Sequence, residues 1–244
     1  LVLTAEYSDL WKEDKKTETN EVMFALQHSA KHKIASNYGK SYYPSDYSPN
    51  AGWADYYGNE DFFKAYPNDD RKEWNYMTEW KIKSGEIIPY TESADKLPAI
   101  SKYYDYDEGA PGKSAQSNGI TCIYRYAEVL LMYAEASTRA TNSVNQDALN
   151  AIQEVQKRAG YQDRQIELTT TTEPTAFLAA VSNERGWEFF AEMKRWFELV
   201  RLEKVKEVRA EEWDASTFNT NHHYYFPVPY QQVDLAGWTN NAGY

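Results

Sequence analysis

The chain has 244 residues, a formal net charge of −11 and a pI near 4.9. Such an acidic balance disfavours nucleic acid and anionic membrane surfaces as partners, because both are negatively charged themselves. The single cysteine, Cys122, excludes an internal disulfide framework, and no apolar run reaches the roughly 20 residues that a membrane span needs.

The first thirty residues contain two apolar anchors and one strand pattern. Leu10 and Trp11 are the expected core contacts in an otherwise polar start. Apolar side chains on both alternating faces of Val22–Gln27 then predict a short strand that is buried on both sides. His28 and His32 are four residues apart and could share a helix face as metal ligands, but spacing links no third ligand to them. The sequence therefore predicts no metal site and no cofactor.

Aromatic residues are concentrated in one irregular segment. The chain contains 8 Trp and 21 Tyr, and 13 of its aromatic residues lie between Tyr38 and Trp80. Prolines and glycines interrupt residues 36–119 throughout, which predicts ordered loops. Two short helices are expected in this segment, at Glu60–Tyr66 and near Asp70–Trp74.

Two interpretations of these rings are open. Rings on loops can pack over a helical core. They can also form a platform for sugars, because Trp and Tyr cover the C–H face of a sugar ring while Asn and Asp bind its hydroxyl groups. Stacking of nucleobases would need a basic groove in addition, which this acidic chain does not favour.

Three helices are expected in the second half of the chain. Apolar spacing predicts one over Ile120–Ala140 and another over Asn145–Ala159, with Asn145 as its N-cap and Gly160 at its end. The short link between them predicts an antiparallel helical hairpin. A third helix is expected after Pro174.

The last part of the chain combines charges, large rings and a proline-rich tail. Its charged residues could act as general acid–base pairs or could lock helices together as buried ion pairs; they are Glu184, Glu188, Glu192, Arg195 and Arg201. The tail that follows has no helical period, and its rings suggest that it wraps the core.

Four stretches, in this order, resemble motifs of the SusD/RagB family, the surface glycan-binding lipoproteins of Bacteroidetes. They are Glu21–Gln27 (EVMFALQ), Tyr124–Ala136 (YRYAEVLLMYAEA), Glu184–Arg201, and Phe226–Pro229 with Asn241–Tyr244 (FPVP and NAGY). The last two are similar to the family runs ERxxELxxEGxRxxDLxR and PIPxxE…QNPGY. The chain departs from these runs at Met193 (Gly in the family), Glu198 (Asp), Val233–Asp234 (the tail's acidic position) and Ala242 (Pro).

The resemblance implies a mostly α-helical fold, with a tetratricopeptide-like helical scaffold, a long aromatic-rich irregular loop region and few short strands. It places the whole chain, 1–244, in the C-terminal part of the family, without the N-terminal helical repeats. Within it, 36–119 would be the loop-rich glycan-binding region, 120–204 the helical core and 205–244 the wrapping tail.

The resemblance also implies a non-catalytic function: binding of an oligo- or polysaccharide at the cell surface and its delivery to a TonB-dependent, SusC-like outer-membrane transporter. The full-length protein would be exposed on the outer membrane, attached by a lipid on an N-terminal Cys that this chain lacks. The expected stacking residues are Tyr42, Tyr43, Trp53, Tyr56, Tyr57 and Trp74, and the expected polar ones are Asn50, Asp55 and Asn59. A helical scaffold that binds a protein partner, or a glycoside hydrolase, remains the alternative.

Overall fold

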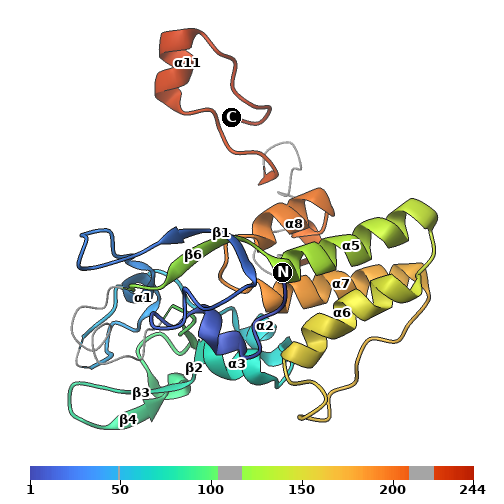
Figure 1. Cartoon of the computed structure of the whole chain (residues 1–244). Coiled ribbons are helices and arrows are strands. Elements are labelled where there is room, and N and C mark those ends of the chain that lie inside the picture. Colours follow the sequence, from blue (N-terminus) through green and yellow to red (C-terminus); the bar gives the residue numbers. More distant parts are fainter. Residues whose placement is uncertain (49, 104–116, 209–222) are drawn as a thin grey trace. The chain divides into compact units, whose positions relative to one another are not determined.

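The computed structural model describes residues 1–48, 50–103, 117–208 and 223–244. The chain divides into two compact units, Leu1–Glu192 and Met193–Tyr244. In the larger unit, three long helices gather at one end, and short helices, strands and loops make up the other (Figure 1). The expectation of a mostly helical chain with a loop-rich region and few short strands is confirmed.

The helical end consists of α5 (Tyr126–Thr141), α6 (Gln146–Arg158) and α7 (Pro174–Glu188). Helix α5 packs against both of the others, and the short link from α5 to α6 forms the predicted helical hairpin. Removal of their inward apolar stripes from water stabilises this end. The most deeply buried members of the shared core are Ala127, Leu131, Ala134, Ile152, Val155 and Phe177.

The ends of α6 follow the local signals in its sequence. Asn145 accepts a hydrogen bond from the backbone N–H of Ala148 at 2.7 Å, which satisfies one of the free donors of the first turn. Gly160, with φ of +83°, lies just beyond the last turn, in a conformation that favours glycine. Both predicted boundaries are confirmed.

The helix predicted over Ile120–Ala140 is wrong in its first turns. Ile120–Arg125 forms strand β6, which pairs antiparallel with β1 (Val22–Gln27), and the helix begins only at Tyr126. Thr, Ile and Tyr in this stretch favour extended backbone. Their partner strand lies about a hundred residues earlier, so local periodicity cannot reveal the pairing. Cys122 is buried in this ladder.

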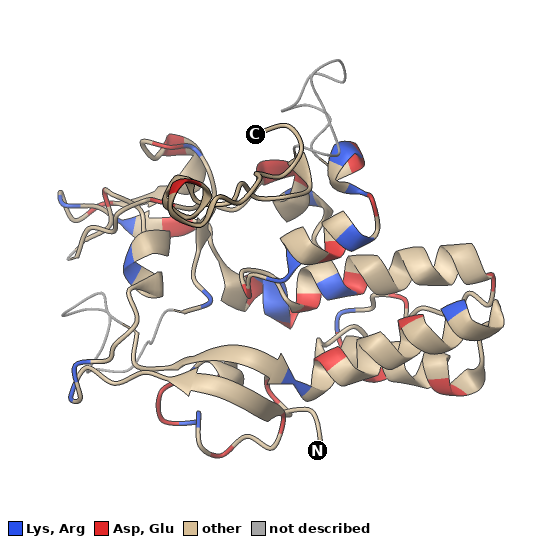
Figure 2. Cartoon of the chain, turned by 90° about the horizontal axis from the view of Figure 1, so that it is seen from above, with Lys and Arg blue, Asp and Glu red and all other residues tan. Residues whose placement is uncertain are grey.

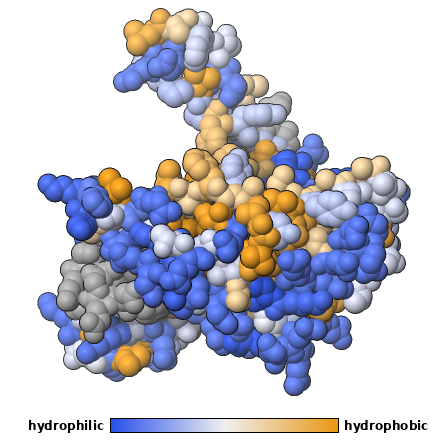
Figure 3. All heavy atoms as spheres, in the orientation of Figure 1, coloured by the Kyte–Doolittle hydropathy of each residue, from blue (hydrophilic) through white to orange (hydrophobic). Residues whose placement is uncertain are grey.

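Strand β1 has no fully buried residue, which corrects the prediction of two buried faces: Val22 and Ala25 are half-buried, and the other four residues are exposed. Met23, Phe24 and Leu26 are each more than half exposed. The register shifts on both sides of Phe24, so the strict alternation of faces is broken there. Apolar side chains lie along the same edge of the larger unit, in orange in Figure 3.

The loop-rich end is built from many short elements. They are the 3-10 helices Tyr7–Leu10 and Tyr90–Glu92; the helices α1 (Tyr38–Tyr42), α2 (Glu60–Ala65) and α3 (Asp70–Asn75); and the paired strands β2 (Tyr76–Met77) with β5 (Ala99–Ile100), and β3 (Glu79–Lys81) with β4 (Ile87–Pro89). Helices α2 and α3 are the two that the sequence predicts. The predicted anchors Leu10 and Trp11 are fully buried in a second core beneath these elements.

A buried cluster of charged side chains joins the loop-rich end to the helical end. In Figure 2, basic and acidic residues meet in the middle of the larger unit, where the strands run into the helices. Every side chain of this cluster is at most 4% exposed. Its members are Arg71, Lys102, Arg125, Arg158, Glu21, Asp69, Glu184, Glu188 and Glu192.

Arg125, at the end of β6, contacts three carboxylates of this cluster. Its Nη1 donates to Glu21 Oε1 at 2.8 Å and to Glu188, and its Nε and Nη2 donate to Glu192 at 3.1 and 2.8 Å. Burial alone would raise the pKa of Glu188, but Arg158, Arg125 and Arg71 together hold that pKa well below its ordinary value. Ion pairing is thus the interpretation that the structure supports for the three glutamates of α7 and the turn after it.

The smaller unit contains α8 (Arg195–Arg201), α9 (Val205–Val208) and α11 (Tyr230–Ala236). Helix α11 corrects the expectation of a tail without helical structure. The end of the tail folds back on its start: Asn240 accepts from the Val228 N–H at 2.8 Å, and Asn241 donates to the Phe226 carbonyl at 2.6 Å. That the tail wraps the core remains a prediction.

Met193 has a φ of +61°, in the left-handed region that favours glycine. It is also the position at which the sequence departs from a family Gly. Met193→Gly is therefore expected to stabilise the protein by about 1 kcal/mol, since a side chain costs about 1–2 kcal/mol in this conformation. Urea unfolding measures the effect. The matched change Met132→Gly, at an exposed position of α5, should lower the free energy of unfolding by about 1 kcal/mol. A lower free energy of unfolding in both variants would contradict the conclusion that Met193 is strained.

Candidate functional site

The backbone of residues 52–56 lies directly on α1 and the turn after it. The N–H groups of Trp53, Ala54 and Asp55 donate to the carbonyls of Lys40, Tyr43 and Ser41 at 2.8, 3.1 and 2.9 Å. Gly52 N–H adds a bond to Pro44 at 2.9 Å. Side chains on this segment are therefore carried by a backbone that is fixed in place, although no regular element contains it.

Gly52 makes this close approach possible. A Cβ atom built on Gly52 would lie 1.9 Å from the carbonyl oxygen of Tyr43 and 2.3 Å from its Cβ. Real atoms do not approach so closely, and the obstructing atoms belong to backbone, which cannot rotate away. A residue without a side chain is thus required where the segment crosses the end of α1.

Two aromatic rings of the segment face solvent. Trp53 is 51% exposed and Tyr56 is 60% exposed. The Lys40 ammonium group lies 5.2 Å from the centroid of the Trp53 ring, close enough for a cation–π contact. The arrangement presents two flat apolar surfaces and one cation on a fixed backbone, which suits a ligand with both apolar faces and polar edges.

Buried rings support the exposed ones. Tyr56 lies 5.7 Å from Tyr42, which stacks on Tyr103 at 5.9 Å, and Tyr103 meets Trp11 edge-on at 5.6 Å. Burial raises the pKa of Tyr42 to about 12. Tyr56 therefore rests on a continuous aromatic core that reaches back to the start of the chain.

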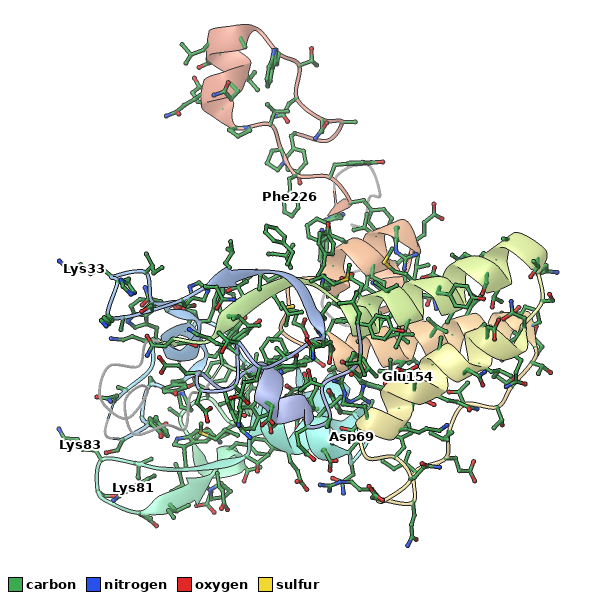
Figure 4. The ribbon with its side chains drawn as sticks, viewed as in Figure 1. Lys33, Asp69, Lys81, Lys83, Glu154 and Phe226 are labelled. Carbon is green, nitrogen blue, oxygen red and sulfur yellow. The ribbon has the colours of Figure 1, made fainter. Side chains whose placement is uncertain are left out.

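A pocket of about 500 Å³ opens beside this segment. The side chain of Asp46 is anchored there by the Trp80 indole N–H, which donates to its Oδ1 at 2.7 Å. Lys83 lies at the tip of the β3–β4 hairpin (Figure 4). The lining offers hydroxyl, carboxylate and ammonium groups to a polar ligand; it consists of Ser45, Asp46, Tyr47, Ser48, Ala51, Ile82, Lys83 and Ser84.

The predicted stacking residues separate into three groups. Trp53 and Tyr56 are exposed and lie on the same segment. Tyr42 and Tyr43 are buried, at 7% and 1% exposed. Their faces are covered in this structure, so they support the surface and do not form it.

Tyr57 and Trp74 are half-buried and make hydrogen bonds inside the protein. The Tyr57 hydroxyl donates to Asp95, and its pKa is raised by burial and by that bond. The Trp74 indole N–H donates to the Lys102 carbonyl at 3.2 Å, near the second core and not on the 52–56 segment.

The three predicted polar residues also differ in their placement. Asp55 is exposed on the same segment as Trp53. Asn59 is exposed too, but its Oδ1 caps α2 by accepting from the Phe62 N–H at 2.9 Å. Asn50 is half-buried beside the pocket-lining residues. Asp55 therefore remains the polar prediction that lies closest to the exposed rings along the backbone.

Sequence reasoning missed Lys40, Asp95 and Tyr103. Each is far in sequence from the ring that it contacts, and none belongs to a motif, so no local signal identifies them. His28 and His32 lie in the irregular segment after β1 and not on one helix face; His28 Nε2 is 2.7 Å from Thr121 Oγ1. Within residues 1–48, 50–103, 117–208 and 223–244, no three His, Cys, Asp or Glu side chains are placed to hold a metal ion. No helix in the described part of the chain has the length and apolarity to span a bilayer.

Solved structures share this fold. A SusD superfamily protein from Parabacteroides distasonis matches all of this chain with a TM-score of 0.80 and 22% identity. Surface glycan-binding protein A from Bacteroides thetaiotaomicron matches 98% of it with a TM-score of 0.71 and 23% identity. The chain covers only 54% and 55% of those two proteins.

Curated relatives agree with these structures. SusD-like protein P2 from Formosa agariphila is 28% identical over 200 residues, which are 74% of this chain and 39% of the relative. SusD-like protein P25 from the same organism is 27% identical over 144 residues, 57% of this chain and 26% of the relative. A model of the SusD family matches residues 82–244, which include the second, third and fourth of the motifs noted in the sequence and most of the fold's helices. The chain belongs to the SusD family.

Proposed function

We propose that this chain is part of a surface protein that binds glycans, with Trp53 and Tyr56 as its stacking surface. The observation that carries the proposal is the exposure of these two rings on a backbone held by hydrogen bonds to α1. Because the segment is already ordered, a bound sugar would not have to order it, and little conformational entropy would be lost on binding.

The chemistry around the rings suits a sugar. The C–H face of a pyranose stacks on an indole or phenol ring, and its hydroxyl groups both donate and accept hydrogen bonds. Lys40 and Asp55 provide a donor and an acceptor next to the rings, and the serines of the neighbouring pocket provide both. Relatives support the ligand class: one solved homologue carries laminarihexaose, and another is described as a laminarin-binding SusD-like protein.

The remaining steps are proposed from the family. The full-length protein would be attached by a lipid to the outer membrane and would pass its glycan, unaltered, to a TonB-dependent transporter of the SusC type. Hydrolysis of a glycoside needs two carboxyl groups on either side of the scissile bond. The carboxylates of the buried cluster are enclosed and paired with arginine or lysine, so they are not open to a glycan.

Trp53→Ala is expected to weaken glycan affinity about tenfold or more, equivalent to about 1.4 kcal/mol, because it removes the larger stacking surface. Native affinity electrophoresis against plant, host and microbial polysaccharides, including laminarin, first identifies the ligand, and calorimetry then measures both proteins. Tyr133→Ala is the matched control, since Tyr133 is exposed on α5 at the opposite end of the larger unit.

Circular dichroism should be unchanged in both variants. If Trp53→Ala and the wild type have equal affinity for a polysaccharide that retards the wild type in electrophoresis, the glycan binds elsewhere on the chain. Shortening of the polysaccharide during incubation would instead favour the hydrolase alternative.

A further inference from the structure

A second pocket, of about 270 Å³, lies among α2, α6 and α7, away from the 52–56 segment. Four separate parts of the chain contribute to it, all within the larger unit. The lining residues are Ala65, Pro67, Gln156, Tyr161, Ile166, Glu167, Thr169, Ala180, Asn183 and Trp187. Its volume is just below the roughly 300–1,000 Å³ of sites for drug-sized ligands, so it suits a single small ring.

The base of the pocket is rigid before any ligand binds. Gln156 is buried; its Oε1 accepts from the Thr169 N–H at 2.9 Å, and its Nε2 donates to Thr169 Oγ1 at 2.8 Å. The Tyr161 hydroxyl donates to Glu184 Oε2 at 3.2 Å, which links the base to the buried charge cluster. Binding here would not require these groups to reorganise.

Other polar groups of the pocket have no hydrogen-bond partner in the described part of the chain. The Trp187 indole N–H, the Asn183 amide and the Glu167 carboxylate make no hydrogen bond to any described residue. Trp187 is half-buried, while Asn183 and Glu167 are exposed at the rim. The site therefore combines an indole ring with one acidic acceptor, one donor, and one amide that can do both.

This set of groups selects among ligand classes. No Lys or Arg lines the pocket, and Glu167 is negatively charged, so an anion would be repelled. An ammonium group has donors only and would leave the indole and amide N–H groups without acceptors. A sugar hydroxyl donates to Glu167 and accepts from Asn183 or Trp187, while the apolar face of its ring covers the indole.

We propose that this pocket binds one uncharged sugar unit and is a second saccharide site, separate from Trp53 and Tyr56. The inference takes its ligand class from the proposed function but stands on different residues. A chain with two such sites would hold a branched or long glycan at two points, and each contact would raise the effective concentration of the sugar at the other.

The test uses the indole N–H signals of the 15N-labelled chain in two-dimensional NMR spectra. Trp187→Phe and Trp53→Phe assign the two relevant signals by their disappearance. The wild type is then titrated with methyl glycosides of glucose, galactose, mannose and N-acetylglucosamine. A saturable shift of the Trp187 signal with at least one of them is expected.

Variants show whether such a shift comes from the pocket. Asn183→Ala and Glu167→Gln, both at exposed positions, should weaken the response of Trp187 about tenfold. Asn150→Ala, an exposed asparagine on α6 outside the pocket, should leave it unchanged. Spectra of all variants should otherwise overlay that of the wild type, which reports that the fold is intact.

The two signals separate this inference from the proposed function. A Trp53 signal that responds while Trp187 stays silent with all four glycosides overturns the second site and leaves the first supported. A Trp187 signal that responds while the Trp53 signal stays silent supports the pocket and contradicts the proposed stacking role of Trp53. A Trp187 response that Asn183→Ala and Glu167→Gln do not weaken also overturns the proposal.

Discussion

Replacing Arg125 by methionine is expected to lower the free energy of unfolding by about 3–5 kcal/mol, a large part of the stability of an ordinary domain. Methionine fills much of the space of the side chain but leaves Glu21, Glu188 and Glu192 without the guanidinium group that they share. Arg158, Arg71 and Lys102 still pair with these carboxylates, but the cluster loses one of its four cations, and the negative charge that is no longer balanced keeps the cost of its desolvation.

The matched control is Arg139→Met. Arg139 pairs with Glu135 at 2.8 Å on α5, but its side chain is 50% exposed, so water screens the pair and the expected loss is about 0–1 kcal/mol. Urea unfolding followed by circular dichroism measures both variants. Equal losses would mean that the buried cluster contributes no more than a surface ion pair.

Gly52→Ala is expected to reduce glycan affinity about tenfold or more. It should also lower the free energy of unfolding by about 1–3 kcal/mol, as overpacking of a tight contact does. The added Cβ would lie 1.9 Å from Tyr43 O, so the backbone of residues 52–56 must move away from α1. Trp53 and Tyr56 would move with it, although neither ring is altered.

Its control is Ala140→Ser, at an exposed position of α5 outside the site. That change adds one oxygen atom where the chain has room, so affinity and stability should both stay near the wild-type values. Affinity is measured by calorimetry against the polysaccharide that the wild type retains. A Gly52→Ala variant with wild-type affinity would show that the stacking surface does not depend on the contact of this segment with α1.

The rings of the aromatic segment divide between the two interpretations that the sequence left open: the buried ones pack, and the exposed ones stay candidates for sugar stacking. Tyr42, Tyr43 and Trp80 are buried and pack, while Trp53 and Tyr56 are exposed. Composition cannot make this distinction, because the same residue types serve both purposes. The backbone hydrogen bonds from residues 52–56 to α1 decide which rings face outward.

Local signals were sufficient for the three long helices, apart from the start of α5. Asn145 and Gly160 mark the ends of α6 by chemistry that acts within one turn, and the apolar stripes of α5, α6 and α7 repeat at helical spacing. The motifs that resemble the SusD/RagB family were also identified from the sequence, in their order. So was the departure from the family Gly at Met193, where the backbone has a positive φ. These features depend on residues that are neighbours in sequence.

Tertiary structure alone decided the rest. Ile120–Arg125 became a strand because β1, about a hundred residues earlier, supplies its hydrogen bonds, and Arg125 became the centre of an ion cluster whose carboxylates come from both ends of the larger unit. The contact of Lys40 with the Trp53 ring also depends on the packing of separate segments. The same holds for the pocket that Trp187 lines together with residues from other parts of the chain. Local signals therefore specify the long helices and the family motifs. Which rings, charges and pockets meet was decided by contacts between residues far apart in the chain, and no local pattern records those contacts.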